Sequence, residues 1–163
     1  MKAWDERSRT ETAMLNPALL ATITANAALR HYEPGKQVMP WYYAFLVAPL
    51  VLHRGTRDAL PRTIRTNMAS WIAEHPVEHA GFGQRARSLR GTVQEGIRFG
   101  LRHHMLTITA EGGLTAQVAR GSGHVLEPDS EVQQIVARAG FVGKWLTKLE
   151  NPATAFVMLG VAP

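Results

Sequence analysis

The sequence predicts an α+β protein that is predominantly helical. Apolar side chains spaced three or four residues apart over residues 84–103 match the period of an amphipathic helix. Alternation of apolar and polar residues, which is typical of a half-buried strand, is strong only within residues 106–118. With 163 residues, 45% of them hydrophobic and 19% charged, the chain is long and apolar enough for one folded domain.

The N-terminal third predicts two helices. Asn16 is a typical N-cap residue, and Pro17 suits the first helical position, where its missing N–H costs nothing. This helix is expected to end near residue 29, before a Pro-Gly pair. Residues 38–52 carry no charge, but fifteen residues that include two prolines fall short of the ~20 that a membrane span needs. We therefore expect a buried core helix there, kinked or ended near Pro49.

The middle third predicts a basic connector and then two helices. Residues 53–65 form the connector, and Thr66 is expected to cap a short helix that Pro76 ends. The next helix spans about residues 84–103, and its apolar stripe consists of Ala86, Leu89, Val93, Ile97 and Leu101. Close packing against another element is expected at three glycines of this helix, Gly91, Gly96 and Gly100.

A β-hairpin follows the long helix. Residues 106–110 and 114–118 alternate apolar with polar side chains on either side of a Glu-Gly-Gly turn. Helices at 41–53, 66–75 and 84–103 followed by a hairpin are the element order of a winged helix-turn-helix. We therefore expect a winged-helix-like core of three helices and a two-stranded hairpin, with extra N- and C-terminal helices.

The C-terminal segment is expected to be helical. Ser130 opens a capping-box pattern for a helix that ends near residue 139, and a second helical piece over residues 142–150 follows Gly140. Asn151 and the proline after it repeat the cap-plus-proline start, and an apolar run occupies residues 153–161.

We expect residues 1–163 to form a single domain in three parts. These are an N-terminal helical extension (1–37), the winged-helix-like core (38–120) and a C-terminal helical segment (121–163). The first seven residues include acids and bases without an apolar run, so we expect no signal peptide. The absence of cysteine fits a reducing compartment, and we expect a cytoplasmic protein without a membrane association.

Positive charge is concentrated in the middle of the chain. Between Arg54 and Arg102 there are nine arginines against four acids, which accounts for the whole net charge of +5. Such local basicity is typical of a nucleic-acid face, and an acidic protein partner would select for it equally well. The arginines of the long helix also have a simpler interpretation as a solvated helix face without a partner. The candidate contact residues are Arg57, Arg62, Arg65, Arg87, Arg98 and Arg102.

Motifs for catalysis or metal binding are not recognisable. The glycines that begin at Gly81 lack the preceding strand of a dinucleotide site. His75 and His79 have the spacing of two metal ligands on one helix, but Pro76 lies between them and breaks that geometry. We expect no catalytic residue, no metal site and no cofactor, although an enzyme of an unrecognised class stays possible.

Seven segments in the same order resemble the middle component of three-component ABC systems, over about residues 12–163. In chain order they are Asn-Pro-Ala-Leu-Leu-Ala (16–21), Leu-Val-Leu-His (50–53), Thr-Arg-Asp-Ala-Leu-Pro-Arg-Thr-Ile-Arg-Thr (56–66), Phe-Gly-Leu-Arg-His (99–103), Gly-Lys-Trp-Leu-Thr-Lys (143–148), Asn-Pro-Ala-Thr (151–154) and Leu-Gly-Val (159–161). None of them is a catalytic signature, so the resemblance depends on the whole set.

The resemblance implies an adaptor. Such middle components are encoded between a coiled-coil ABC ATPase and a variable effector, in systems thought to defend bacteria against phages or plasmids. The implied partners are this ATPase and this effector, with possible nucleic acid contact through the ATPase complex. An adaptor would use Arg57, Arg62 and Arg65 or the apolar tail for protein contacts. The tail residues expected to dock are Phe156, Met158 and Leu159, unless they are buried in the chain's own core.

The alternative function is a free-standing winged-helix DNA-binding regulator. It would use Arg87, Arg98 and Arg102, which form a row beside the apolar stripe of the long helix. Tight binding of duplex DNA by the chain alone, falling steeply as the salt concentration rises, would distinguish this function from the adaptor.

Overall fold

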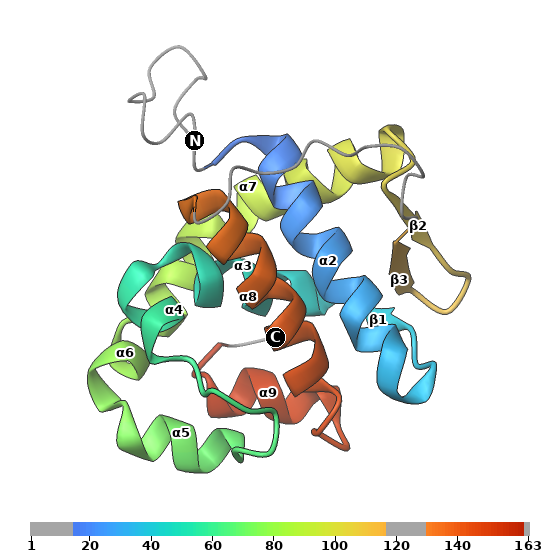
Figure 1. Cartoon of the computed structure of the whole chain (residues 1–163). Helices are drawn as coiled ribbons and strands as arrows, with labels where there is room; N and C mark the ends of the chain where they lie inside the picture. Colours follow the sequence, from blue (N-terminus) through green and yellow to red (C-terminus); the bar gives the residue numbers. More distant parts are fainter. Residues whose placement is uncertain (1–14, 117–129, 162–163) are drawn as a thin grey trace.

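The computed structural model describes residues 15–116 and 130–161, and these residues form packed helices with a small sheet at one side (Figure 1). In chain order the elements are α2 (Pro17–Gly35), β1 (Met39–Pro40), the 3-10 helix η2 (Trp41–Tyr43), α3 (Ala44–Leu52), α4 (Arg54–Ala59), α5 (Met68–Glu74), α6 (Pro76–Ala80), α7 (Phe82–Arg102), β2 (Leu106–Ile108), β3 (Gly113–Ala116), α8 (Glu131–Leu146) and α9 (Pro152–Met158).

Helix α2 is the central packing element. It begins as predicted, with the Asn16 side chain accepting a hydrogen bond from the backbone N–H of Ala18 (2.8 Å). It continues beyond residue 29 to Gly35, with Pro34 in its last turn. Figure 1 shows α8 and α7 lying against α2, and α3 packs against both α7 and α8. The helix predicted as a terminal extension therefore contributes to the main helix–helix contacts.

Glycines allow both neighbours to approach α2 closely. A Cβ atom at Gly96 of α7 would overlap the Leu20 side chain, and one at Gly143 of α8 would overlap the Ala27 backbone. A Cβ atom at Gly100 would lie 2.7 Å from the Leu106 side chain and 3.3 Å from Ala21. The prediction that glycines of the long helix mark close packing is confirmed for Gly96 and Gly100.

The uncharged stretch 38–52 forms several elements rather than one helix. Its first residues form β1 and η2, and only Ala44–Leu52 is α-helical. Pro49 lies inside α3 and does not end it. The expected burial is confirmed, because nearly every side chain of α3 lies in the core.

Two short helices occupy segments that were expected to be irregular. Helix α4 lies within the predicted connector, where the His53 side chain accepts a hydrogen bond from the Thr56 N–H and caps its start. Asn67, and not Thr66, caps α5 through the Ala69 N–H (2.8 Å). Pro76 occupies the first turn of α6, where proline is well tolerated. It therefore begins a helix as well as limiting α5.

The predicted hairpin is present as β2 and β3, and β1 adds a third strand. Its first strand ends at Ile108 rather than residue 110, and residues 117–118 of the expected second strand lie outside the described residues. The sheet order is β1-β3-β2, with antiparallel pairing that places Leu114 opposite Ile108 on one side and Met39 on the other. A two-residue strand such as β1 has no alternation pattern of its own, so its pairing was not predictable from local sequence.

The C-terminal helices begin as predicted, but the first of them has no break at Gly140 and ends at Leu146 rather than near residue 150. Ser130 caps α8 through the Gln133 N–H (3.2 Å), and Asn151 caps α9 through the Ala153 N–H (2.9 Å), as expected. The predicted break at Gly140 is wrong, because α8 continues to Leu146. Gly140 faces α2, where a Cβ atom would lie 2.9 Å from side-chain atoms of Asn26 and Arg30.

The structure therefore confirms a predominantly helical protein with a small antiparallel sheet. The winged-helix arrangement stays a prediction, as does the three-part division of the chain. Within the described ranges, none of the helices has the length and apolar character required to cross a membrane.

Candidate functional site

The arginine-containing segment 57–66 lies along one side of α8, and three hydrogen-bonding contacts join the two. The first partner is at the start of α8, the second near its middle and the third near its end. The contacts are Arg57 Nη2 to Glu131 Oε1 (2.7 Å), Arg138 Nη1 to the Pro61 carbonyl (3.4 Å) and Trp145 Nε1 to the Thr66 carbonyl (2.7 Å). The α8 partners are seven residues apart, which is about two helical turns, so they share one face of the helix.

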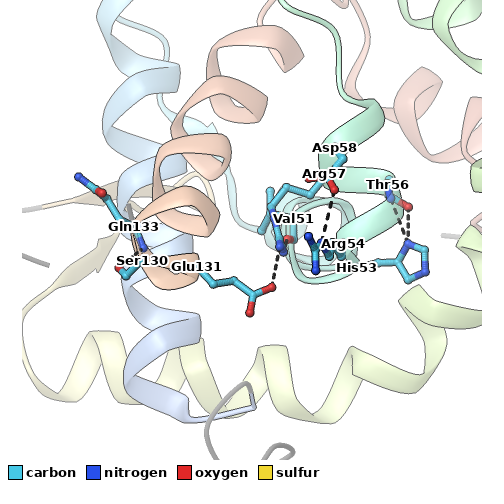
Figure 2. Close-up of polar contacts among 9 residues, drawn as sticks. All are labelled: Val51, His53, Arg54, Thr56, Arg57, Asp58, Ser130, Glu131 and Gln133. Carbon is cyan, nitrogen blue, oxygen red and sulfur yellow. Dashed lines mark hydrogen bonds and ion pairs between the residues drawn. The ribbon is translucent and has the colours of Figure 1, made fainter. Parts of the chain in front are cut away.

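Arg57 is a buried structural residue. Only 3% of its surface is exposed, and its Nη1 donates to the Val51 carbonyl (2.8 Å) while its Nη2 pairs with Glu131 (Figure 2). Its Nε is buried without a hydrogen-bond partner in the described part of the chain. The expected partner contact by Arg57 is therefore not available, because the guanidinium is enclosed within the fold. Neighbouring Arg54, in contrast, is exposed and only weakly paired with Asp58 (3.6 Å).

A second polar cluster joins the start of α4 to α6 and α7. The Nδ1 of His53 accepts from the Thr56 N–H (3.1 Å) and lies 2.9 Å from the Thr56 hydroxyl (Figure 2). Arg85 Nη2 donates to the same hydroxyl (3.1 Å) and to the Glu78 carbonyl (2.6 Å). Burial and the nearby Arg85 charge lower the pKa of His53 below its ordinary value. This cluster links α4 to α6 and α7, and its surroundings favour the neutral form of His53.

Arg62 and Arg65 remain exposed on the segment that α8 holds. Arg65 also lines a cavity of about 300 Å³. Residues 64–68 form one wall, and Trp145, Lys148 and Leu149 form the other. Sequence reasoning did not connect Lys148 with Arg65, because 83 residues separate them along the chain. Only the path of the segment along α8 brings the two cations to one cavity.

The basic row on α7 is exposed, as predicted. Arg87, Arg98 and Arg102 lie on the solvent side of the helix, while its opposite side packs against α2. From Arg87 to Arg102 the helix rises by fifteen steps, or about 22 Å. Arg90, which was not among the candidate residues, is also exposed. Within the described ranges, none of these four arginines has an ion-pair partner.

The apolar tail belongs largely to the chain's own core. Phe156 and Leu159 are buried, and the Phe156 ring stacks against Tyr43 at a centroid distance of 6.5 Å. Met158 is partly buried, and its carbonyl accepts from His79 Nε2 (2.8 Å). Val157 is the exposed apolar residue of this helix, at 74%. Docking through Phe156 and Leu159 is therefore not supported, because their side chains fill the core.

Potential metal ligands do not cluster in the described ranges. No group of three or more histidine, aspartate and glutamate side chains lies close enough there to hold one ion. The described site thus consists of exposed arginines on α7 and on the 57–66 segment, with a cavity beside Arg65.

The comparisons with known proteins give one match. A family model described as "ABC-three component (ABC-3C) system Middle Component 3" matches residues 4–163. No curated protein and no solved structure matches the chain. The matched range includes the 57–66 segment, α7 and α8.

Proposed function

The chain belongs to the Middle Component 3 family of ABC-three component systems, and from this premise we propose that it is a non-catalytic accessory subunit. It couples a coiled-coil ABC ATPase to an effector through protein contacts. We propose a role in defence against phages or plasmids, exercised in the cytoplasm. The family match over residues 4–163 is the observation that carries this proposal.

Two surfaces are available for such contacts. The first contains Arg62 and Arg65, on a segment that side-chain contacts hold against α8. The second is the row on α7. Exposed arginines without intramolecular partners suit acidic protein surfaces, because the planar guanidinium donates paired hydrogen bonds to a carboxylate. A surface held in place before binding loses little conformational entropy when a partner docks.

The test is co-purification of the tagged chain with the ABC ATPase and effector of its own system. The three components are expressed together, the lysate is treated with nuclease, and the eluate is quantified by mass spectrometry. We expect the ATPase to be recovered in a stoichiometric amount after nuclease treatment. Recovery of the chain alone would contradict the accessory function.

A second candidate function is a free-standing DNA-binding regulator with a winged-helix module. In this arrangement α3, α5 and α7 would be the three helices and β2–β3 the wing. The exposed arginine row of α7 favours it, because arginines along one helix face suit a line of phosphates. Titration of a duplex with the isolated chain at several salt concentrations tests it. A flat salt response, or binding only in the millimolar range, would exclude this function.

A further inference from the structure

We propose that the cavity between residues 64–68 and the end of α8 is the docking site for a partner peptide that carries an acidic residue beside an apolar one. This inference rests on the accessory function proposed above and specifies the chemistry of one contact. The cavity lining combines apolar side chains with two exposed cations.

Four apolar side chains line the cavity beside the polar Thr66 and Asn67, and its walls are held in place. Met68 and Trp145 are buried, and Ile64 and Leu149 are partly buried. The indole N–H of Trp145 donates to the Thr66 carbonyl (2.7 Å), which joins the two walls. The Trp145 ring also packs edge-on against Trp71, with 5.5 Å between the ring centroids. An apolar side chain entering a preformed cavity is desolvated with little rearrangement of the walls.

The charge at the edge of the cavity is uncompensated. Arg65 lies on one wall and Lys148 on the other, and both are exposed. In the part of the chain that the structure describes, neither forms an ion pair, and no acidic residue lines the cavity. Lys144, one turn before Lys148, does have an acid: its Nζ lies 3.0 Å from Glu33. A carboxylate from a partner is the complement that the cavity edge lacks.

A protein segment fits this combination better than nucleic acid does. Nucleic acid binding uses a line of cations that follows the phosphates, and α7 carries that arrangement rather than the cavity. Two cations beside a small cavity with apolar side chains in its lining instead match one apolar anchor with a neighbouring aspartate or glutamate. A central anchor surrounded by polar contacts is the usual arrangement of an interface hot spot.

The experiment compares two charge-reversal variants of the full chain. Arg65→Glu with Lys148→Glu reverses the cavity edge, and Arg87→Glu with Arg98→Glu reverses an equal charge on α7. All four residues are exposed, so we expect unchanged thermal unfolding. Isothermal titration is carried out with the purified ABC ATPase and with the effector of the same system, one at a time. At least one of the two should bind roughly tenfold or more weakly to the cavity variant while binding the α7 variant as it binds wild type. Overlapping peptides that cover the sequence of that partner should include one that wild type binds and the cavity variant does not. This peptide should contain an acid beside an apolar residue.

The outcomes separate this inference from the proposed function. If wild type binds a component and both variants bind equally well or equally poorly, the docking site is wrong while the accessory function stands. If the cavity variant instead only abolishes self-association of the chain, the occupant is a second copy and the inference is also wrong.

If wild type binds neither component, the proposed function fails, and a display selection decides the site by itself. Random twelve-residue peptides are selected on wild type and counter-selected on the cavity variant. Enrichment of peptides with an acid beside an apolar residue supports the docking site, and failure to enrich them overturns it.

Discussion

At the scale of single residues, burial divides the arginines of the middle third into two groups. Arg57 is enclosed and paired with Glu131, whereas Arg62, Arg65 and the α7 arginines face solvent. A buried guanidinium depends on its counter-charge because solvent cannot replace the lost interaction. Arg57 therefore contributes to stability, and the exposed arginines are available for binding.

The Arg57–Glu131 pair predicts an asymmetric response to mutation. Glu131→Ala leaves a charge buried at Arg57, so we expect it to lower the free energy of unfolding by about 3 kcal/mol. Arg57→Met leaves the Glu131 carboxylate without its partner, but this side chain is 48% exposed and can be hydrated. We therefore expect the free energy of unfolding to fall by only about 1–2 kcal/mol. Urea unfolding at pH 7 measures both values. Equal losses, or a larger loss for Arg57→Met, would contradict this assignment.

Buried His31 predicts a pH-dependent stability. Its Nδ1 lies 3.1 Å from the Gln37 carbonyl, and burial lowers its pKa below the ordinary value of 6.5. The unfolded chain therefore binds the proton more readily than the folded chain, and stability decreases as the pH falls below 6.5. The slope for one such group is at most about 1.4 kcal/mol per pH unit.

His31→Asn retains a donor for the Gln37 carbonyl but does not titrate. Urea unfolding between pH 5 and 8 should therefore show a shallower decrease for this variant than for wild type. Parallel curves for the two proteins would exclude His31 as the titrating group.

At the scale of elements, α2 is packed closely between α7 and α8. Gly96 and Gly143 permit the approach on the two sides, because any side chain there would overlap α2. Helical glycines reduce intrinsic helix stability by about 1 kcal/mol relative to alanine. Packing against α2 is the physical reason for a glycine at position 96 of α7.

Gly96→Ala is therefore expected to destabilise the protein despite the better helix propensity of alanine. The added Cβ would overlap Leu20, and overpacking of this kind costs about 1–3 kcal/mol. Gly35→Ala is the matched control, because its Cβ would meet only the Gln37 side chain, at 3.8 Å. Thermal unfolding should show a lower midpoint for Gly96→Ala and no decrease for Gly35→Ala. A stabilised Gly96→Ala variant would argue against the close α2–α7 contact.

The hydrogen bonds between segment 57–66 and α8 predict that removing one of them makes the segment separate from α8 more often. Trp145→Phe removes the hydrogen bond to the Thr66 carbonyl, and such a bond contributes about 1 kcal/mol. Trypsin cleavage after Arg62 and Arg65 should then become roughly fivefold faster, if cleavage follows the open population. Cleavage after Arg90 and Arg98 in α7 serves as the control within the same digest. An equal acceleration at all four sites would indicate global destabilisation instead.

At the scale of the whole molecule, the net charge of +5 is presented on separate surfaces. The α7 row extends along one helix, while Arg65 and Lys148 line the cavity at the end of α8. Separate cationic surfaces permit one chain to contact two partners at the same time. This arrangement suits the accessory role proposed for a middle component.

The separation of the two surfaces predicts where any DNA affinity resides. Changing Arg87, Arg98 and Arg102 to Gln should reduce the dependence of log K on log salt by about 0.9 for each phosphate that the variant no longer neutralises. Changing Arg62 and Arg65 to Gln should leave that slope unchanged. Fluorescence anisotropy with a labelled duplex measures both. An equal reduction in the two variants would show that the surfaces act as one.

Local signals in the sequence predicted several elements correctly. The helix starts at Asn16, Ser130 and Asn151, the amphipathic α7 and the hairpin all depend on residues close together along the chain. The errors at Thr66 and Gly140 came from the same local rules. Neighbouring Asn67 caps α5, and α8 passes through Gly140 because that glycine faces α2.

The candidate site was predicted only in part. The basic character of the middle third and the exposure of the α7 row followed from charge and helical period. The burial of Arg57 did not, because its acid partner lies 74 residues away in the sequence. The cavity was equally inaccessible to local reasoning, because Arg65 and Lys148 line one cavity only after α8 has packed beside the segment.

The sequence alone thus determined the family, the predominantly helical class and the concentration of arginines, since each depends on residue order and composition. The tertiary structure alone decided which of those arginines are exposed, which apolar tail residues belong to the core, and which segments enclose the cavity. The physical reason is the distance along the chain over which each interaction acts. Caps and helical periods act within a few residues, whereas burial and electrostatic pairing depend on contacts between segments that are far apart along the chain.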